Sequence, residues 1–325
     1  MSETLTDVQV RAATDEDLPE ILELLRASLG WRPEDPNEEF FRWKHHANCF
    51  GRSPAWVAVH AGQVAGYRTF MRWRFLDDQG KRVKAVRAVD TATAPSLQGR
   101  GIFRTLTIRG VAELTMAGDD LVFNTPNSQS RPGYLKMGWA EVRRLPVGVL
   151  PSGARGLTRM MTSRVPARKW SNATDVGWPA AAALSDHGLA ESLLRHAPDK
   201  GFRTDRSAAY LSWRTALPQL AYRLLLTNDS DPDQGGLIFR LRQRGDAVEA
   251  VVVELLAPNP LVSARLVRRL LKLTGADYAI GLRTGPSAGL LPLPGQGPVL
   301  TVRPLASSPP QPTAWALTLG DVELF

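Results

Sequence analysis

One stretch decides the fold: Asp90-Thr-Ala-Thr-Ala-Pro-Ser-Leu-Gln-Gly-Arg-Gly-Ile-Phe-Arg-Thr-Leu-Thr-Ile-Arg109. It opens with small and β-branched residues, which favour a strand, and Pro95 ends that strand because proline cannot donate to a sheet. A turn at residues 98–101 follows, and from Ile102 apolar residues recur at helical spacing. A glycine turn that opens a helix is an anion site, because the first helical turn has free N–H groups and the helix dipole adds positive charge.

The turn is neither the dinucleotide motif G-x-G-x-x-G nor a P-loop. It resembles the pyrophosphate loop of the GNAT acyltransferases, written Arg/Gln-x-x-Gly-x-Gly/Ala after a strand. Gln98, Gly101 and Phe103 fill those positions, although Phe103 stands where the family has a small residue. The resemblance implies that coenzyme A (CoA) is bound by the strand edge and the turn, namely by Thr91, Ala92, Thr93, Gln98, Gly99, Arg100, Gly101, Ile102, Phe103 and Arg104.

A second motif lies downstream of a short apolar strand at residues 121–123. GNAT enzymes carry an Asn and then a helix that ends in Tyr-x-x-x-Gly-Phe, and Asn127, Tyr134, Gly138 and Trp139 match this spacing. The resemblance implies that Tyr134 protonates the leaving thiolate of CoA and that Asn127 helps to bind the cofactor. The structural alternative is that Tyr134 is an ordinary core tyrosine.

Alternation of apolar residues predicts the remaining strands of the first half. A strand at 8–11, a capped helix from Thr14 to Gly30, an aromatic-rich helix at 38–46, a hairpin at 55–60 and 64–75, and a strand at 83–93 precede the glycine turn. Residues 141–150 complete the half as one more strand. In GNAT folds the strands on either side of the glycine turn run parallel and splay apart, and pantetheine adds to the exposed edge as a peptide strand would.

The second half repeats the order hairpin, strand, helix, strand from Arg206 onward. We therefore expect an α/β (α+β) chain of two GNAT-like domains, each a mixed, splayed central sheet flanked by helices. The expected divisions are a catalytic domain at 1–150, a basic connector at 151–205 and a degenerate second domain at 206–325. In the second half Ala257-Pro-Asn-Pro replaces the glycine turn, so no phosphate cradle is expected there. Residues 286–312 are rich in Pro, Gly and Ser and predict a loop, and 315–319 predict a closing strand.

The composition is that of a globular protein with 43% hydrophobic and 22% charged residues. No apolar run is long enough to span a bilayer, and the polar N-terminus lacks the pattern of a secretory signal. With a single cysteine, Cys49, these features predict a cytoplasmic protein without a membrane partner. The formal net charge of +8 favours an anionic partner, either CoA or nucleic acid.

The residue that takes the proton of the attacking ammonium is open. Asp90 is one candidate, although strand alternation turns it away from Thr91 and Thr93, and a capping or ion-paired role is the alternative. The terminal carboxylate of Phe325 is the second candidate, because Eis-type acetyltransferases and N-myristoyltransferases place a chain end in the cleft; the alternative is a frayed tail. The adjacent His45 and His46 have no third ligand, so no metal is expected; one of them is a further possible base.

The resemblance implies an N-acyltransferase (EC 2.3.1.-) that moves an acyl group, in the first instance from acetyl-CoA, to a primary amine of a small molecule or peptide. A GNAT-type transferase that takes its group from tRNA is one alternative, because the basic connector suits a polyanion. A non-catalytic, CoA-binding module is the other. The sequence does not identify the acceptor, the acyl length or the oligomeric state.

Overall fold

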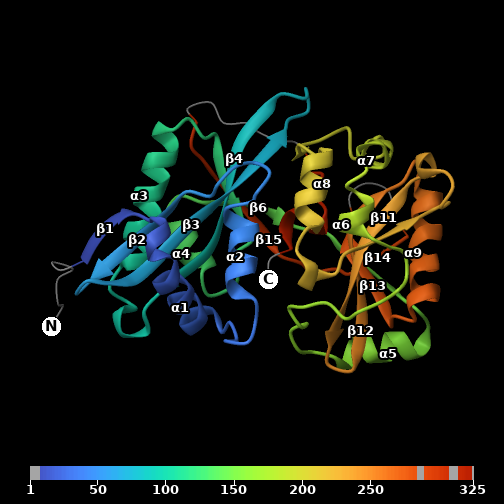
Figure 1. The fold of residues 1–325 in the computed structure, drawn as a ribbon, viewed down its shortest axis with the longest axis horizontal. Helices are drawn as coiled ribbons and strands as arrows, with labels where there is room; N and C mark the ends of the chain where they lie inside the picture. Colours follow the sequence, from blue (N-terminus) through green and yellow to red (C-terminus); the bar gives the residue numbers. More distant parts are fainter. Residues whose placement is uncertain (1–7, 284–288, 307–313, 324–325) are drawn as a thin grey trace. The chain divides into compact units, whose positions relative to one another are not determined.

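The computed structural model describes residues 8–283, 289–306 and 314–323. They form two compact units, and each contains one mixed sheet with flanking helices (Figure 1). The described residues of the first unit lie within Met1–Phe75, Lys81–Arg143 and Val299–Gln311; those of the second lie within Leu76–Gly80, Arg144–Pro298 and Pro312–Phe325. The predicted fold class, α/β with two mixed sheets, is confirmed.

The first sheet has the strand order β1-β2-β3-β4-β5-β15-β6. Its β4 and β5 are parallel and joined through α3, whereas β1 with β2, β2 with β3 and β5 with β15 are antiparallel. The elements of this unit are β1 Val8–Ala12, α1 Leu18–Leu29, α2 Asn37–His45, β2 Ala55–His60, β3 Gln63–Leu76, β4 Arg82–Thr93, α3 Ile102–Met116, β5 Leu121–Asn124, α4 Arg131–Lys136, β6 Ala140–Arg144 and β15 Val299–Pro304.

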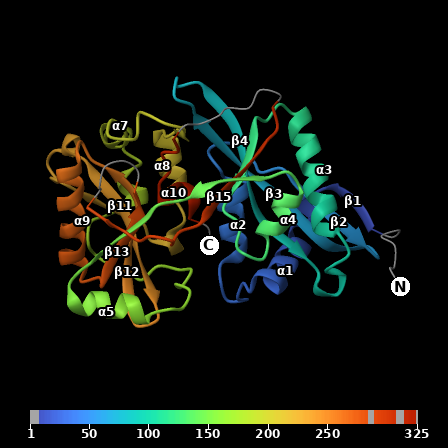
Figure 2. The ribbon, with the colours of Figure 1, turned by 180° about the vertical axis from the view of Figure 1, so that it is seen from behind.

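Helices cover both faces of the first sheet, and two successive residues of β3 show which helices lie on which face. Tyr67 packs against Phe41 of α2, with ring centroids 6.1 Å apart, whereas Arg68 bonds to Tyr134 of α4. Because successive side chains of a strand point to opposite faces, α2 and α4 cover different sides of the sheet. Figures 1 and 2 show α3 beside the first sheet, and the apolar residues of α3 share a core with Tyr134.

The second sheet has the order β14-β7-β13-β12-β11-β10-β8. Its β12 and β13 are parallel and joined through α9, so this unit repeats the strand–helix–strand arrangement of β4, α3 and β5. Its elements are β7 Val147–Pro151, α5 Ala154–Thr162, β8 Trp178–Pro179, α6 Ala180–Ala183, α7 His187–Leu194, β9 Arg203–Thr204, α8 Ala208–Thr215, β10 Arg223–Leu226, β11 Gly236–Arg244, β12 Ala247–Leu256, α9 Pro260–Thr274, β13 Tyr278–Leu282, β14 Leu291–Pro292 and α10 Leu319–Val322.

The two halves of the chain exchange strands. The β7 strand, from the first half, pairs with β13 in the second sheet, and β15, from the second half, pairs with β5 in the first sheet. The single strand expected at 141–150 is thus two strands in different sheets, and the loop expected at 286–312 contains β14 and β15. Strand pairing therefore does not follow the division that the sequence suggested at residue 150.

The segment expected to be a basic connector contains α5, β8, α6 and α7. The short strand β8 pairs with β10, and Arg159 of α5 forms an ion pair with Asp277 at 3.3 Å. This segment is therefore a part of the second unit's own structure. None of the described helices has both the length and the apolar run needed to cross a bilayer.

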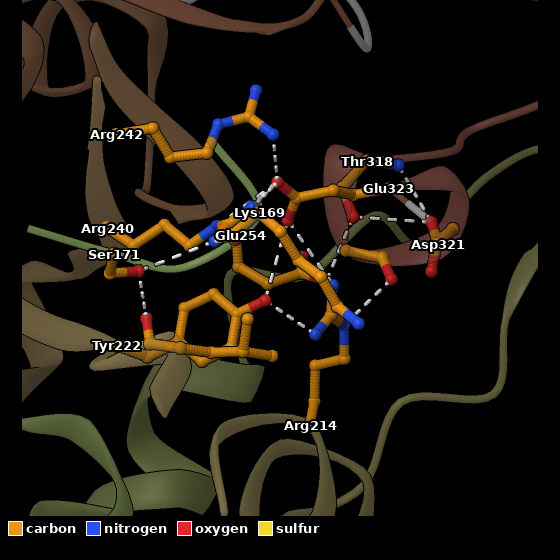
Figure 3. A network of polar contacts seen from close by, with 12 residues as sticks. Lys169, Ser171, Arg214, Tyr222, Arg240, Arg242, Glu254, Thr318, Asp321 and Glu323 are labelled. Atoms are coloured by element: carbon orange, nitrogen blue, oxygen red, sulfur yellow. Dashed lines mark hydrogen bonds and ion pairs between the residues drawn. The ribbon is translucent and has the colours of Figure 1, made fainter. Parts of the chain in front are cut away.

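Buried ion pairs fix the end of the described chain within the second unit (Figure 3). Glu323 contacts Arg240 at 2.6 Å, Arg242 at 3.2 Å and Arg214 at 3.5 Å. Burial would raise the pKa of Glu323, but these cations outweigh it and hold that pKa below its ordinary value. The closing strand expected at 315–319 is only an isolated bridge at Trp315, followed by α10, whose Asp321 binds Arg206 at 2.7 Å.

Candidate functional site

The glycine turn stands where the sequence predicted it, between β4 and α3. Gly99 and Gly101 both adopt left-handed backbone conformations, with φ of 77° and 83°, which glycine reaches without steric cost. Gly101 is the N-cap of α3, and no side chain among the described residues bonds to the amides of the first helical turn. Those N–H groups are therefore available to an anion, with the dipole of a 15-residue helix behind them.

The side chains of the turn are exposed, except for two that face the interior. Gln98, Gly99, Arg100, Gly101 and Arg104 lie at the surface, whereas Ile102 is buried in the core. Phe103 is half-buried and meets the ring of Tyr134 edge-on, with centroids 5.5 Å apart. The large residue at this position thus packs beside Tyr134, which explains the departure from the usual small residue.

Next to the turn, β4 and β5 pair over only part of their length. The parallel pairing joins Ala85, Val86 and Arg87 to Leu121, Val122 and Phe123. The β4 strand continues to Thr93, so the stretch with Thr91, Ala92 and Thr93 extends past the end of this pairing. A strand edge of this kind can hydrogen bond to an extended ligand through its backbone.

Tyr134 lies beside this strand edge and is 5% exposed. Its hydroxyl accepts a hydrogen bond of 2.7 Å from Nη1 of Arg68, and the same Nη1 donates to the hydroxyl of Thr91. The ring of Trp139 supports Tyr134 from another side at 5.1 Å. The phenol is thus buried in the core, as the structural alternative supposed, but its hydroxyl is directed to a cation and to β4.

Arg68 was not singled out by the sequence, and its guanidinium is completely buried. Its Nε and Nη2 have no hydrogen-bond partner, and no carboxylate within the described ranges pairs with it. The ring of Phe70 lies 4.4 Å from the guanidinium carbon. A desolvated cation–π contact contributes about 2 kcal/mol or more, whereas burying an ion costs several kcal/mol and removes its hydrogen bonds to water. The rings therefore offset only part of the cost of burying this charge.

Asp90 has an unusual backbone conformation within β4. It has a φ of +43°, a left-handed conformation that is rare outside glycine, and its carboxylate contacts Lys44 and His45 of α2 at 2.9 and 2.7 Å. Burial would raise the pKa of Asp90, but the Lys44 cation and the His45 hydrogen bond hold it well below its ordinary value. Asp90 is thus ion-paired, as the alternative to a catalytic base supposed, and a carboxylate held in this way is a weak base.

His45 links Asp90 to Ser53. Its Nε2 faces Asp90, and its Nδ1 lies 3.0 Å from the hydroxyl of Ser53. Burial lowers the pKa of His45, and the hydrogen bond with Asp90 opposes that shift only in part. The neutral ring therefore donates from Nε2 to Asp90 and accepts from Ser53. His45 and Ser53 line a cavity of about 480 Å³ between α1, α2 and the start of β2, which the glycine turn and Tyr134 do not line.

Two predicted site residues lie elsewhere or outside the described chain. The side-chain oxygen of Asn127 accepts from the backbone of Gln129 and Ser130, so it shapes the turn before α4, and its role toward CoA stays a prediction. Phe325 lies outside the described residues. Across the described ranges no three His, Cys, Asp or Glu side chains are grouped as metal ligands.

The corresponding helix of the second unit is closed by its own sequence. Asn259 caps α9, and its side-chain oxygen accepts from the amides of Leu261 and Val262 at 3.1 and 3.0 Å. These are the first-turn amides that an anion would need. In the second unit these amides are therefore occupied by a side chain of the chain itself.

Residues 9–142 match the family model of the acetyltransferase (GNAT) domain. Among solved structures, a GCN5-related N-acetyltransferase from Anabaena variabilis is similar at 15% identity and a TM-score of 0.65, over 92% of this chain and 73% of that one. Eis1 from Mycobacterium abscessus is similar at 14% identity and a TM-score of 0.55, over 92% and 73%. At these identities the likeness concerns the fold, and no curated protein matches the sequence.

Proposed function

Because residues 9–142 belong to the GNAT acetyltransferase family, we propose that the protein is an acyl-CoA-dependent N-acyltransferase. Acetyl-CoA is the proposed donor, and a primary amine of a small molecule or peptide is the acceptor. The observation that carries the proposal is the open N-terminus of α3, whose first-turn amides no side chain of the described ranges caps. The turn before it follows the strand edge of β4, where Arg68 bonds to both Thr91 and the hydroxyl of Tyr134.

In this proposal the diphosphate of CoA binds the amides that follow Gly101. The pantetheine arm runs along Thr91, Ala92 and Thr93, which brings the thioester toward Tyr134. Backbone N–H groups of that edge hold the oxygen that becomes negative when the amine attacks. Tyr134 gives its proton to the sulfur as the carbon–sulfur bond breaks.

The attacking amine must also lose a proton to a base. We assign Asp90 a positioning role toward His45, because the paired carboxylate is a poor proton acceptor. The carboxylate of Phe325 remains a candidate, and its role is tested by deleting that residue. Unchanged turnover in the deletion variant would remove the chain end from the mechanism.

Calorimetric titration with acetyl-CoA tests the donor site directly. Gly101→Ala places a Cβ on a residue with a φ of +83°, which costs about 1–2 kcal/mol, and it alters the turn that meets the diphosphate. We expect acetyl-CoA to bind about tenfold more weakly, a loss of about 1.4 kcal/mol. Gly275→Ala is the matched control, because Gly275 caps the end of α9 with a φ of +64° and has open space around its Cα.

Two further measurements separate the alternatives. Release of free thiol from acetyl-CoA across a panel of amines identifies a transferase and its class of acceptor. Tight CoA binding without thiol release in the presence of any amine would instead indicate a non-catalytic module. A salt-sensitive shift of tRNA in a gel, together with no binding of acetyl-CoA, would indicate a tRNA-linked donor.

A further inference from the structure

Arg68 is a buried cation for which the described part of the first unit provides no anion. Its side chain is fully buried on β3, and two of its three nitrogens have no hydrogen-bond partner. The third nitrogen donates only to neutral oxygens, those of Thr91 and Tyr134. A charge buried in this way is stabilised by an opposite charge, because neutral partners and aromatic rings replace only part of its lost hydration.

The position of Arg68 indicates which anion it would meet. Thr91 lies where β4 continues past its pairing with β5, and Tyr134 is the proposed donor of a proton to sulfur. One guanidinium nitrogen bonds to both residues. The cation is therefore fixed at the point where, in the proposed reaction, negative charge develops on the leaving group.

Resting on the proposed function, we infer that Arg68 is the counter-ion of the CoA sulfur when the carbon–sulfur bond breaks. The amine nitrogen bonds to the thioester carbonyl carbon, and the sulfur leaves with the bonding electron pair. Tyr134 then gives its hydroxyl proton to the sulfur, and the negative charge moves to the phenol oxygen, which Arg68 already contacts. The proton lost by the amine returns to that oxygen through solvent. Arg68 thus faces the negative charge at both stages.

The test compares CoA with desulfo-CoA, which lacks the sulfur but keeps the phosphates. Affinities of the wild-type protein for both are measured by calorimetry from about pH 6.5 to about pH 8.5, below and up to the ordinary pKa of a thiol. If Arg68 binds the thiolate, CoA becomes at least fivefold tighter relative to desulfo-CoA over this range. Taking the ratio removes the ionisation of the phosphates, which the two ligands share.

Two variants assign the effect to the guanidinium. Arg68→Met removes the charge and should make the affinity ratio independent of pH, whereas Arg68→Lys keeps a charge and should restore part of the dependence. A wild-type ratio that does not change with pH overturns the inference, whether or not either variant folds. In that case CoA still binds and the proposed function stands; failure of both ligands to bind would overturn the proposed function as well as the inference.

Discussion

The two units contain the same strand–helix–strand arrangement, but they differ in how helix-end amides and buried arginines are paired. In the second unit Asn259 occupies the first-turn amides of α9, and buried arginines such as Arg206 and Arg240 pair with carboxylates. In the first unit the first-turn amides of α3 are uncapped, and Arg68 has no carboxylate among the described residues. The same strand–helix–strand arrangement thus has a helix N-terminus that is capped by a side chain in the second unit and, within the described residues, uncapped in the first.

The largest expected effect comes from breaking the buried ion pairs of the second unit. Glu323→Ala leaves Arg214, Arg240 and Arg242 without this carboxylate, and breaking a buried pair in this way costs about 3–5 kcal/mol. Urea unfolding should show a correspondingly lower midpoint. The exposed pair of Arg195 with Asp233 is the control, because Asp233→Asn should leave the midpoint nearly unchanged. Equal shifts in both variants would contradict a special role for the buried cluster.

The second largest effect tests whether Tyr134 of the first unit takes part in catalysis. Tyr134→Phe removes the proposed proton donor but keeps the ring that packs against Phe103 and Trp139. We expect turnover of acetyl-CoA to fall about 100-fold, with its KM little changed, because proton transfer by a positioned group contributes on the order of 10²–10⁴-fold. Steady-state thiol release measures both constants. A variant with full turnover would return Tyr134 to the role of a core residue.

A smaller effect tests whether burial lowers the pKa of His45 in the folded protein. Burial lowers its pKa below the ordinary value, so below about pH 6.5 the unfolded chain binds more protons at this site than the folded chain does. Stability is therefore lost as the pH falls through this range, and His45→Gln should reduce the loss. The adjacent His46 also has a lowered pKa, because of partial burial and the nearby Arg52, so His46→Gln is measured beside it. The free energy of unfolding is measured by urea unfolding at several pH values. If it falls with decreasing pH as steeply in His45→Gln as in the wild type, His45 is not the source of the pH dependence.

The smallest effect sharpens the comparison of the two helices. Asn259→Ala removes the cap of α9 and frees the amides of Leu261 and Val262, at a cost of about 1 kcal/mol. Thermal unfolding measures this loss. We expect the number of acetyl-CoA molecules bound per chain to stay at one, because Ala257-Pro-Asn-Pro stands before α9 in place of a glycine turn. A second bound acetyl-CoA would show that the cap alone closes the site.

The sequence predicts the parts of the site that depend on local chemistry. The strand, the glycine turn and the helix at residues 90–109 follow from Pro95, the two glycines and the apolar spacing, and all three stand as predicted. The sequence does not predict a role for Arg68, because an arginine within an alternating strand has the pattern of a solvent-facing residue. Only the packing of α4, whose Tyr134 is 66 residues away, shows that this arginine is buried.

Partners that are distant in sequence also explain where the predicted fold differs from the observed one. The residues of β15 stand in a Pro- and Gly-rich stretch and become a strand because β5, far away in sequence, provides the hydrogen bonds. The left-handed conformation of Asp90, whose carboxylate contacts Lys44 and His45 of a helix distant in sequence, is likewise not predicted by alternation. Periodicity describes a strand by itself, so it does not register either influence.

The exchange of β7 and β15 has a consequence for how the protein is made. During synthesis the first sheet lacks its β15 partner until residues 299–304 have left the ribosome, long after the glycine turn and Tyr134 have been translated. Until then the far edge of β5 has unpaired backbone groups, which can pair with other chains. A ribosome that stops midway through the chain therefore releases a first sheet without β15, and translation through residue 304 is needed to complete it.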